Sequence, residues 1–180
     1  MTRCEGARKV VVFDRDGTLV IDRGYLGDPD GLQFAPGAPE ALRWLRDHGY
    51  RMVVITNQSG VGRGFFGLER LRAMNERLAD MVEQAGARLD GIYACPHSPN
   101  DGCTCRKPEI GLLLQAASDL HFDPADSIVI GDKVSDIEFG RRAGAITILI
   151  AGHGNGAGAQ PDMVAPDLVE AARAVTARRG

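Results

Sequence analysis

The sequence predicts a single α/β domain in which a parallel sheet of about five strands is covered by helices on both faces. Three observations indicate this class. Short apolar runs alternate along the chain with stretches whose apolar residues have helical spacing. The chain has 180 residues, which suits one domain with a sizeable core, and residues 1–180 show no internal repeat. Hydrophobic residues make up 44% and charged residues 25%, as in soluble globular proteins.

The first apolar run, residues 9–13, predicts a buried strand that leads directly into two aspartates. Residues 36–48 predict the first helix, and Gly49 suits its C-terminal cap. The apolar residues of this helix fall on one face: Ala38, Ala41, Leu42 and Leu45. The run RMVVIT at residues 51–56 predicts the second buried strand.

The second half of the chain continues the alternation. A long helix is predicted at residues 68–85, and a half-polar third strand at residues 89–94. The apolar face of the long helix comprises Leu71, Met74, Leu78, Met81 and Val82. The remaining predicted elements are a helix at 108–120 with a proline in its first turn, a strand at 127–130, a helix at 134–143, a strand at 145–150 and a helix at 166–178. The glycine-rich stretch 152–158 is interpreted as a flexible connector.

Polar residues follow the ends of these strands. Right-handed crossovers place the carboxyl ends of parallel strands at one edge of the sheet, where α/β proteins bind their ligands. The loops expected at this edge are 22–35, 57–67 and 95–106. Residues far apart in the sequence are therefore expected to converge there.

Four aspartates belong to this edge: Asp14, Asp16, Asp132 and Asp136. Several carboxylates around one point form a site for a hard cation, and Mg²⁺ suits such a site because it also accepts waters and phosphate oxygens. The alternative is that Asp16 and Asp132 only cap turns. Their shared position at strand ends, next to basic residues, favours the magnesium hypothesis.

Hydrogen-bond donors surround the same point. Lys107 and Lys133 supply ammonium groups, and Thr56 supplies a hydroxyl. The loop after Thr56 adds amide, hydroxyl and backbone N–H groups from Asn57, Gln58 and Ser59. A phosphoryl group requires such donors around its oxygens. The alternative interpretation of each lysine is an ordinary surface charge.

A cluster of cysteines lies in the loop after the third strand. Cys95, His97, Cys103 and Cys105 fall within eleven residues. Three cysteines and one histidine match a closed tetrahedral zinc site, which would be structural because it leaves no open coordination position. The alternative is a disulfide with a spare thiol, which the spacing of Cys103 and Cys105 and a cytosolic setting both disfavour.

The ordered motifs Asp14-x-Asp16-Gly-Thr, Thr56, Lys107 and Gly-Asp132-x-x-x-Asp136 resemble the four motifs of the haloacid dehalogenase (HAD) superfamily of phosphohydrolases. The resemblance covers about the first 150 residues and implies a three-layer, Rossmann-like HAD fold. No large cap domain fits between the first two strands.

The resemblance also implies the role of each motif residue. Asp14 would be the nucleophile that forms an aspartyl-phosphate, and Asp16 the general acid that later acts as general base. Thr56 and Lys107 would hold the phosphoryl oxygens. The implied magnesium ligands are Asp14, the backbone carbonyl of Asp16, and Asp132, with Asp136 as a supporting carboxylate.

A zinc loop in a capless member resembles two branches of the family, one acting on heptose bisphosphate and one on histidinol phosphate. The loop residues favour the first, which implies removal of the 7-phosphate of D-glycero-D-manno-heptose 1,7-bisphosphate and a product used for nucleotide-activated heptose in lipopolysaccharide or other glycans. By this resemblance the sugar or its distal phosphate is contacted by Asp22, Arg23, Gly24, Tyr25 and Arg106, and Lys133 lies near the transferred phosphoryl group.

Net charge and hydropathy limit the classes of partner expected for this protein. The net charge of −3 supports neither a nucleic-acid partner nor attraction to a membrane surface. No stretch approaches about 20 apolar residues, and the N-terminus lacks the apolar segment of a signal peptide. We therefore expect a cytoplasmic protein. We also expect a monomer, because no amphipathic helix is left over in the predicted packing. Two alternatives from other classes are a phosphoacceptor domain like the receivers of two-component signalling and a zinc-stabilised binding module; multiple-turnover phosphate release would exclude both.

Overall fold

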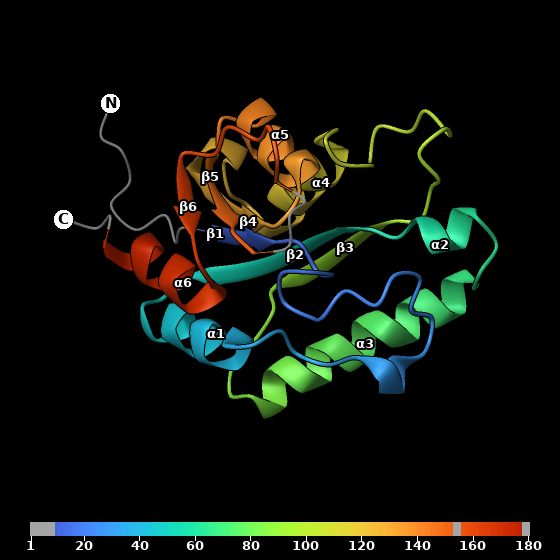
Figure 1. The fold of residues 1–180 in the computed structure, drawn as a ribbon, viewed down its shortest axis with the longest axis horizontal. Coiled ribbons are helices and arrows are strands. Elements are labelled where there is room, and N and C mark those ends of the chain that lie inside the picture. Colours follow the sequence, from blue (N-terminus) through green and yellow to red (C-terminus); the bar gives the residue numbers. More distant parts are fainter. Residues whose placement is uncertain (1–9, 153–155, 178–180) are drawn as a thin grey trace.

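A computed structural model of the chain describes residues 10–152 and 156–177. Within these residues six strands form one sheet in the order β3-β2-β1-β4-β5-β6, and all neighbouring strands are parallel (Figure 1). The strands are β1 (Val10–Phe13), β2 (Arg51–Asn57), β3 (Gly91–Cys95), β4 (Ser127–Gly131), β5 (Ile146–Ile150) and β6 (Met163–Ala165). The predicted α/β class with a parallel sheet is confirmed.

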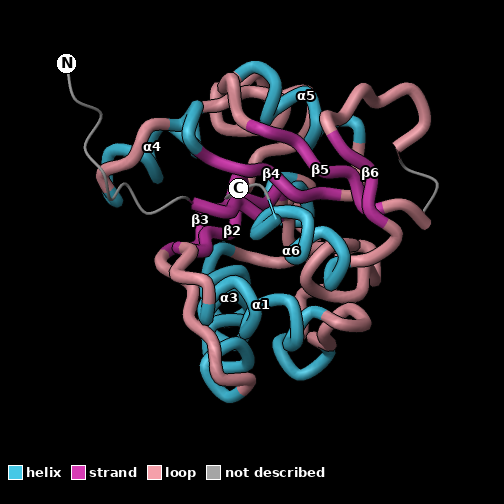
Figure 2. Tube along the Cα trace, turned by 90° about the vertical axis from the view of Figure 1, so that its left-hand side faces the viewer, coloured by secondary structure: helices cyan, strands magenta, loops and turns pink. Residues whose placement is uncertain are grey.

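Helices cover both faces of the sheet. They are α1 (Ala38–Asp47), α2 (Ser59–Gly62), α3 (Leu68–Gln84), α4 (Gly111–Leu120), α5 (Val134–Arg142) and α6 (Leu168–Ala177), with two short 3-10 turns, η1 (Pro29–Gly31) and η2 (Pro124–Asp126). Figures 1 and 2 show α1, α3 and α6 on one face of the sheet and α4 and α5 on the other. The result is a three-layer sandwich.

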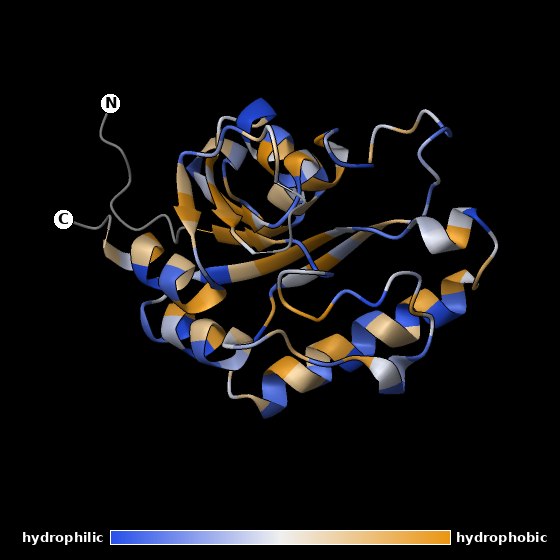
Figure 3. Cartoon of the chain, in the orientation of Figure 1, coloured by the Kyte–Doolittle hydropathy of each residue, from blue (hydrophilic) through white to orange (hydrophobic). Residues whose placement is uncertain are grey.

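The alternation of side chains along each strand builds two cores. In β1, Val11 and Phe13 pack into a core with α1, α3 and α6, whereas Val10 and Val12 pack into a second core with α4 and α5. The strands are apolar over nearly their whole length in Figure 3, as expected for a sheet buried on both faces. The apolar faces predicted for α1 and α3 are buried at every predicted position.

The structure adds one strand to the five that the sequence predicts. β6 has only three residues and lies between Pro161 and Pro166, so it carries no periodic signal. Residues 151–162 connect it to β5, a length sufficient for a parallel crossover. The Asp162 carboxylate accepts hydrogen bonds from the backbone N–H and hydroxyl of Thr147, at 2.7 and 2.8 Å, which fixes this edge of the sheet.

Several boundaries also differ from the prediction. The helix expected from residue 108 begins at Gly111, because the residues before it form turns in which the Gly111 N–H donates to the Thr104 carbonyl. The loop expected at 57–67 contains the short helix α2. The third strand ends at Cys95, one residue later than predicted. Residue 9 of the first predicted strand, residue 178 of the last predicted helix and residues 153–155 of the glycine-rich connector lie outside the described residues.

The insertions at the carboxyl edge of the sheet are small. Between β1 and α1 the only regular element is η1, and between β2 and α3 it is α2. The expectation of a site without a large cap domain agrees with this. None of the described helices is long and apolar enough to span a bilayer.

Neighbouring leucines of α4 provide a test of this packing. Leu113 is fully buried, whereas Leu114 is 52% exposed. We expect Leu113→Ala to lower the free energy of unfolding by about 2–5 kcal/mol, because it leaves a cavity between α4 and the sheet. Leu114→Ala should change it by less than about 0.5 kcal/mol. Urea denaturation measures both, and equal effects would contradict the assigned faces of α4.

Candidate active site

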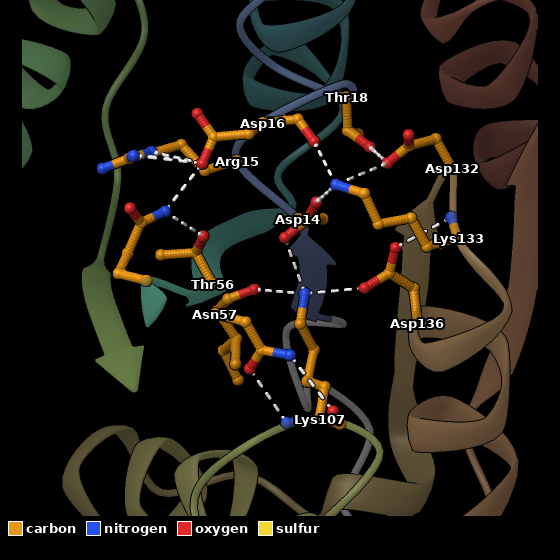
Figure 4. Close-up of polar contacts among 12 residues, drawn as sticks. Asp14, Arg15, Asp16, Thr18, Thr56, Asn57, Lys107, Asp132, Lys133 and Asp136 are labelled. Atoms are coloured by element: carbon orange, nitrogen blue, oxygen red, sulfur yellow. Dashed lines mark hydrogen bonds and ion pairs between the residues drawn. The ribbon is translucent and has the colours of Figure 1, made fainter. Parts of the chain in front are cut away.

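A cavity of about 320 Å³ opens at the carboxyl ends of β1 and β2 and beside the N-terminus of α5. Most of the predicted site residues line it, although they come from distant parts of the chain. The lining residues are Asp14, Asp16, Asp22, Gly24, Tyr25, Thr56, Asn57, Gln58, Ser59, Gly60, Lys107, Lys133, Ser135 and Asp136. Figure 4 shows the polar groups at its centre.

The ammonium group of Lys107 is the centre of the polar network. Its Nζ lies 2.7 Å from Asp14 Oδ1, 2.7 Å from Asp136 Oδ1 and 2.7 Å from the backbone carbonyl oxygen of Ile55 (Figure 4). Lys107 is only 4% exposed. The three hydrogen bonds use all three donors of the ammonium group, so a charge that would be costly to bury is fully satisfied.

These contacts shift the pKa values of the groups involved. Burial alone would raise the pKa of Asp14, but the ammonium groups of Lys107 and Lys133 outweigh it and hold the pKa below the usual value of an aspartate. Burial would lower the pKa of Lys107, but Asp136 and Asp14 raise it. Burial raises the pKa of Asp136 to about 6, although Lys107 opposes the shift. Asp14 is therefore the carboxylate of this group that is most firmly ionised.

Asp16 lies in a different environment. Its Oδ2 accepts a hydrogen bond of 2.6 Å from the Gln58 amide and pairs with the guanidinium of Arg15 at 3.0 Å. Burial is the largest influence and raises the pKa of Asp16; the Arg15 charge opposes this shift, and the Asp14 charge adds to it. The two aspartates of one short segment thus differ in the direction of their pKa shifts.

The three oxygens predicted to bind magnesium face one point. The Lys133 ammonium lies there, 2.9 Å from the Asp16 backbone carbonyl oxygen, 3.6 Å from Asp14 Oδ2 and 3.8 Å from Asp132 Oδ1. A cation thus already meets all three oxygens. Gly17 permits this approach, since a Cβ at this residue would lie 2.5 Å from Asp132 Oδ2, and its φ of +92° also suits glycine.

Asp136 takes part in this site from the first turn of α5. Among the described residues, Asp14, Asp132 and Asp136 offer oxygens within 4.8 Å of one another. Both oxygens of Asp136 already have partners, since Oδ1 pairs with Lys107 and Oδ2 accepts from the backbone N–H of Lys133. Its geometry is that of a carboxylate that supports the two lysines.

Two residues predicted to bind substrate have their amides occupied within the protein. The Asn57 side chain accepts from the backbone N–H of Lys107 at 2.9 Å and donates to its carbonyl at 3.1 Å. The Gln58 amide donates to Thr56 Oγ1 at 2.9 Å as well as to Asp16. Both residues line the cavity, but their side-chain amides position other groups of the site.

The predicted substrate loop lies only partly at the cavity. Asp22, Gly24 and Tyr25 line it, and Tyr25 stacks on Phe65 with ring centroids 4.6 Å apart. Arg23 does not line the cavity and donates to Gln33 at 2.7 Å. Arg106 lies beside a neighbouring cavity and donates to the His97 carbonyl at 3.3 Å.

The predicted zinc ligands come from the two ends of the 95–106 loop and lie together. The Cys95 Sγ lies 3.6 Å from Cys103 Sγ and 3.2 Å from Cys105 Sγ, and His97 Nδ1 lies 3.1 Å from Cys105 Sγ. The three cysteines are free thiols, which excludes the disulfide alternative in this structure. Ligands of a tetrahedral zinc ion would be separated by roughly 3.5–3.8 Å, slightly more than two of these distances. All four donor atoms lie within 4.8 Å of one another, so the residue types and their grouping are compatible with zinc.

Sequence reasoning missed two members of the site. Arg15 lies between the two aspartates and is one of the largest fully buried side chains of the protein. Ser135, in the first turn of α5, lines the cavity. The sequence offered no signal for Arg15, because an arginine at this position would ordinarily be expected to point to solvent.

Comparison with known proteins gives a consistent result. The family model described as haloacid dehalogenase-like hydrolase matches residues 11–83, and a second one, described as HAD-hydrolase-like, matches residues 104–171. The chain is similar to the D-glycero-beta-D-manno-heptose-1,7-bisphosphate 7-phosphatases of Haemophilus ducreyi (41% identity, covering 90% of this chain and 92% of the relative) and Yersinia pestis (36%, covering 93% and 95%). Among solved structures it resembles the D,D-heptose 1,7-bisphosphate phosphatase of B. bronchiseptica complexed with magnesium and phosphate, with a TM-score of 0.86, 32% identity and coverage of 94% and 99%.

Replacement of Lys107 tests the central network. We expect Lys107→Met to lower the free energy of unfolding by about 3–5 kcal/mol, because Asp14 and Asp136 then remain buried without their shared cation. Lys133→Met should cost clearly less, since that side chain is 36% exposed. Urea denaturation of both variants measures the difference. A Lys107→Met protein as stable as the wild type would contradict the assigned role of the ammonium group.

Proposed function

Because the chain belongs to the haloacid dehalogenase-like hydrolase family, we propose that it hydrolyses the 7-phosphate of D-glycero-D-manno-heptose 1,7-bisphosphate. Relatives with that activity in their names are 36% and 41% identical to the chain and match at least 90% of it. The magnesium and phosphate in the related B. bronchiseptica structure agree with a metal-dependent phosphatase. The named relatives support this substrate over histidinol phosphate, the alternative that the sequence left open.

One observation supports the chemistry above all others. Asp14 and Asp16 lie two residues apart, yet the pKa of Asp14 is lowered and that of Asp16 is raised. Opposite shifts in neighbouring carboxyl groups suit a pair in which one acts as the ionised nucleophile and the other carries a proton. The arrangement suits phosphoryl transfer to Asp14.

In the first step Asp14 attacks phosphorus. A bond forms between an Asp14 carboxylate oxygen and phosphorus, and the bond from phosphorus to the oxygen of the sugar breaks. Asp16 gives its proton to that leaving oxygen, so that an alcohol departs rather than an alkoxide. Thr56 lines the cavity, where its hydroxyl can donate to a phosphoryl oxygen. The three donors of Lys107 are used within the protein, so Lys107 would offset the negative charge of the phosphoryl group through its own charge.

In the second step Asp16 acts as a base. It takes a proton from a water molecule that attacks the phosphorus of the aspartyl-phosphate. Inorganic phosphate leaves, and Asp14 returns to its ionised form. The cavity is open on the solvent side, since no large domain covers it, so water can enter without a lid movement.

The donor set fits Mg²⁺, which prefers carboxylate and carbonyl oxygens. The residues that would hold it are Asp14, Asp16 through its backbone carbonyl, and Asp132. When bound, the ion offsets the negative charge of the phosphoryl group. The Lys133 ammonium now meets the same three oxygens, which supports a cation site at this point.

The cysteine cluster fits a structural Zn²⁺ held by Cys95, His97, Cys103 and Cys105. Four protein donors would leave no open position for catalysis. The cluster ends two residues before Lys107, and Arg106 donates to the carbonyl of the proposed ligand His97. We propose that the metal fixes the segment that carries Lys107.

The nucleophile assignment predicts the effect of one isosteric change. Asp14→Asn should lower kcat by at least about four decades, because an amide oxygen is a poor nucleophile. The matched control is Asp47→Asn, whose side chain is 59% exposed and which should retain full activity. Circular dichroism should show the same fold for both. Substantial turnover by Asp14→Asn would disprove the assignment.

The substrate is tested by kinetics with Mg²⁺. We expect kcat/KM for phosphate release from one anomer of heptose 1,7-bisphosphate to exceed that for histidinol phosphate by at least about two decades, each decade being about 1.4 kcal/mol. Both anomers are compared side by side with histidinol phosphate. A preference for histidinol phosphate would preserve the aspartate chemistry and overturn the proposed substrate.

The zinc hypothesis predicts that metal content and stability change together. Cys103→Ser should reduce bound zinc well below about one equivalent and lower the Tm by more than about 5 °C. Thr104→Ser, an exposed change in the same loop, should alter neither. Metal analysis and thermal unfolding measure both quantities. Loss of zinc with an unchanged Tm would show that the ion is not structural.

A further inference from the structure

Among the residues that the structure describes, Arg15 is a large buried cation that the proposed mechanism leaves unused. It is 1% exposed and lies between the proposed nucleophile Asp14 and the proposed acid Asp16. A buried guanidinium is costly unless it is paired and hydrogen-bonded. Its position in the site therefore requires an explanation.

The guanidinium of Arg15 has two partners, the Asp16 carboxylate and the Asn75 amide oxygen. Its Nε and Nη2 lie 3.1 and 3.0 Å from Asp16 Oδ2 (Figure 4). Its Nη1 lies 3.5 Å from Asn75 Oδ1 on α3. Gln58 Nε2 lies 2.6 Å from the same Oδ2. Within the described residues, the side-chain donors that reach the Asp16 carboxylate all reach Oδ2.

The backbone around Asp16 is held as well. The Arg15 carbonyl accepts hydrogen bonds from the N–H groups of Leu19 and Val20, both at 3.0 Å, and the Gly17 N–H donates to the Val20 carbonyl at 2.8 Å. Rotation of the side chain is the freedom that this turn leaves to Asp16. The guanidinium of Arg15, which also contacts Asn75 on α3, and the amide of Gln58 restrict this rotation of the Asp16 side chain.

We propose that Arg15 is a positioning residue, which holds Asp16 by Oδ2 so that Oδ1 is the oxygen that carries the proton. Oδ2 accepts hydrogen bonds from Arg15 Nε and Gln58 Nε2, one for each of its two lone pairs, and also pairs with Arg15 Nη2, so Oδ1 is the oxygen left to carry a proton. In the first step the Oδ1–H bond breaks and the proton moves to the leaving oxygen as its bond to phosphorus breaks. In the second step the water proton returns to Oδ1. This inference rests on the proposed phosphatase function.

The proposed positioning role requires the planar shape of the Arg15 guanidinium as well as its charge. Two adjacent N–H groups of a planar guanidinium can reach one oxygen from a fixed direction, whereas a lysine ammonium is a point charge on a flexible stem. Arg15→Lys keeps the charge and removes the fork. This variant therefore separates orientation of Asp16 from simple neutralisation of its charge.

The experiment compares steady-state kinetics of the wild type and Arg15→Lys with Mg²⁺ and heptose 1,7-bisphosphate. We expect kcat to fall about 10- to 100-fold, because proton transfer is impaired, while KM changes by less than about threefold. Arg72→Lys, an exposed change on α3, is the matched control and should leave both constants unchanged. An unchanged kcat for Arg15→Lys, or a loss confined to KM, would overturn the proposal.

An ester with a better leaving group adds a second readout. p-Nitrophenolate departs without a proton, so the kcat/KM for p-nitrophenyl phosphate should fall less than about threefold in Arg15→Lys. An equal fall in kcat/KM for heptose 1,7-bisphosphate and for p-nitrophenyl phosphate would indicate a general structural defect and refute the positioning role. If the wild type released phosphate from no ester, the proposed function itself would fail, which is a separate outcome.

A second variant covers the case in which Arg15→Lys does not fold. Asn75→Ala keeps Arg15 and removes only its outer anchor at 3.5 Å. We expect a smaller loss of kcat for heptose bisphosphate, about two- to fivefold, with KM and Tm close to those of the wild type. An unchanged kcat in Asn75→Ala would exclude the anchoring through α3.

Discussion

The structure depends on one buried ammonium group. Lys107 joins Asp14 at the end of β1, Asp136 at the start of α5 and a carbonyl of β2, three segments that are remote in sequence. Without a shared cation, two buried carboxylates would repel each other and lose solvation. With it, the pKa of Asp14 is lowered although only 6% of this residue is exposed. The packing of these three segments and the ionisation of Asp14 therefore both depend on the charge of Lys107.

The sequence predicted the layers of the fold because periodicity reports burial. The buried faces of α1 and α3 and the five predicted strands, β1 to β5, follow from the pattern of apolar residues. β6 was missed, since three residues between two prolines carry no period. The start of α4 was placed too early at Pro108, because the turn hydrogen bond between Gly111 and Thr104 depends on a tertiary arrangement that no local propensity encodes.

The sequence predicted which residues belong to the site better than it predicted the contacts that they make. Motif residues at strand ends converge, as parallel topology requires, and the cavity collects most of them. The sequence could not reveal that the amide of Asn57 binds the backbone of Lys107 or that the amide of Gln58 binds Asp16. Nor could it show that Arg15 turns inward, because its partners Asp16 and Asn75 meet only after α3 packs on the sheet.

The position of Lys107 follows from constraints on both of its sides. Before it, the Cys95, His97, Cys103 and Cys105 cluster gathers the loop against the end of β3. Beside it, Asn57 holds its backbone N–H and carbonyl from the end of β2. After it, the turn between Thr104 and Gly111 sets the start of α4. A long flexible side chain can hold three partners at 2.7 Å only if its backbone is fixed. In the function proposed above, the cysteine cluster would therefore support the site by positioning Lys107 rather than by contact with the phosphoryl group.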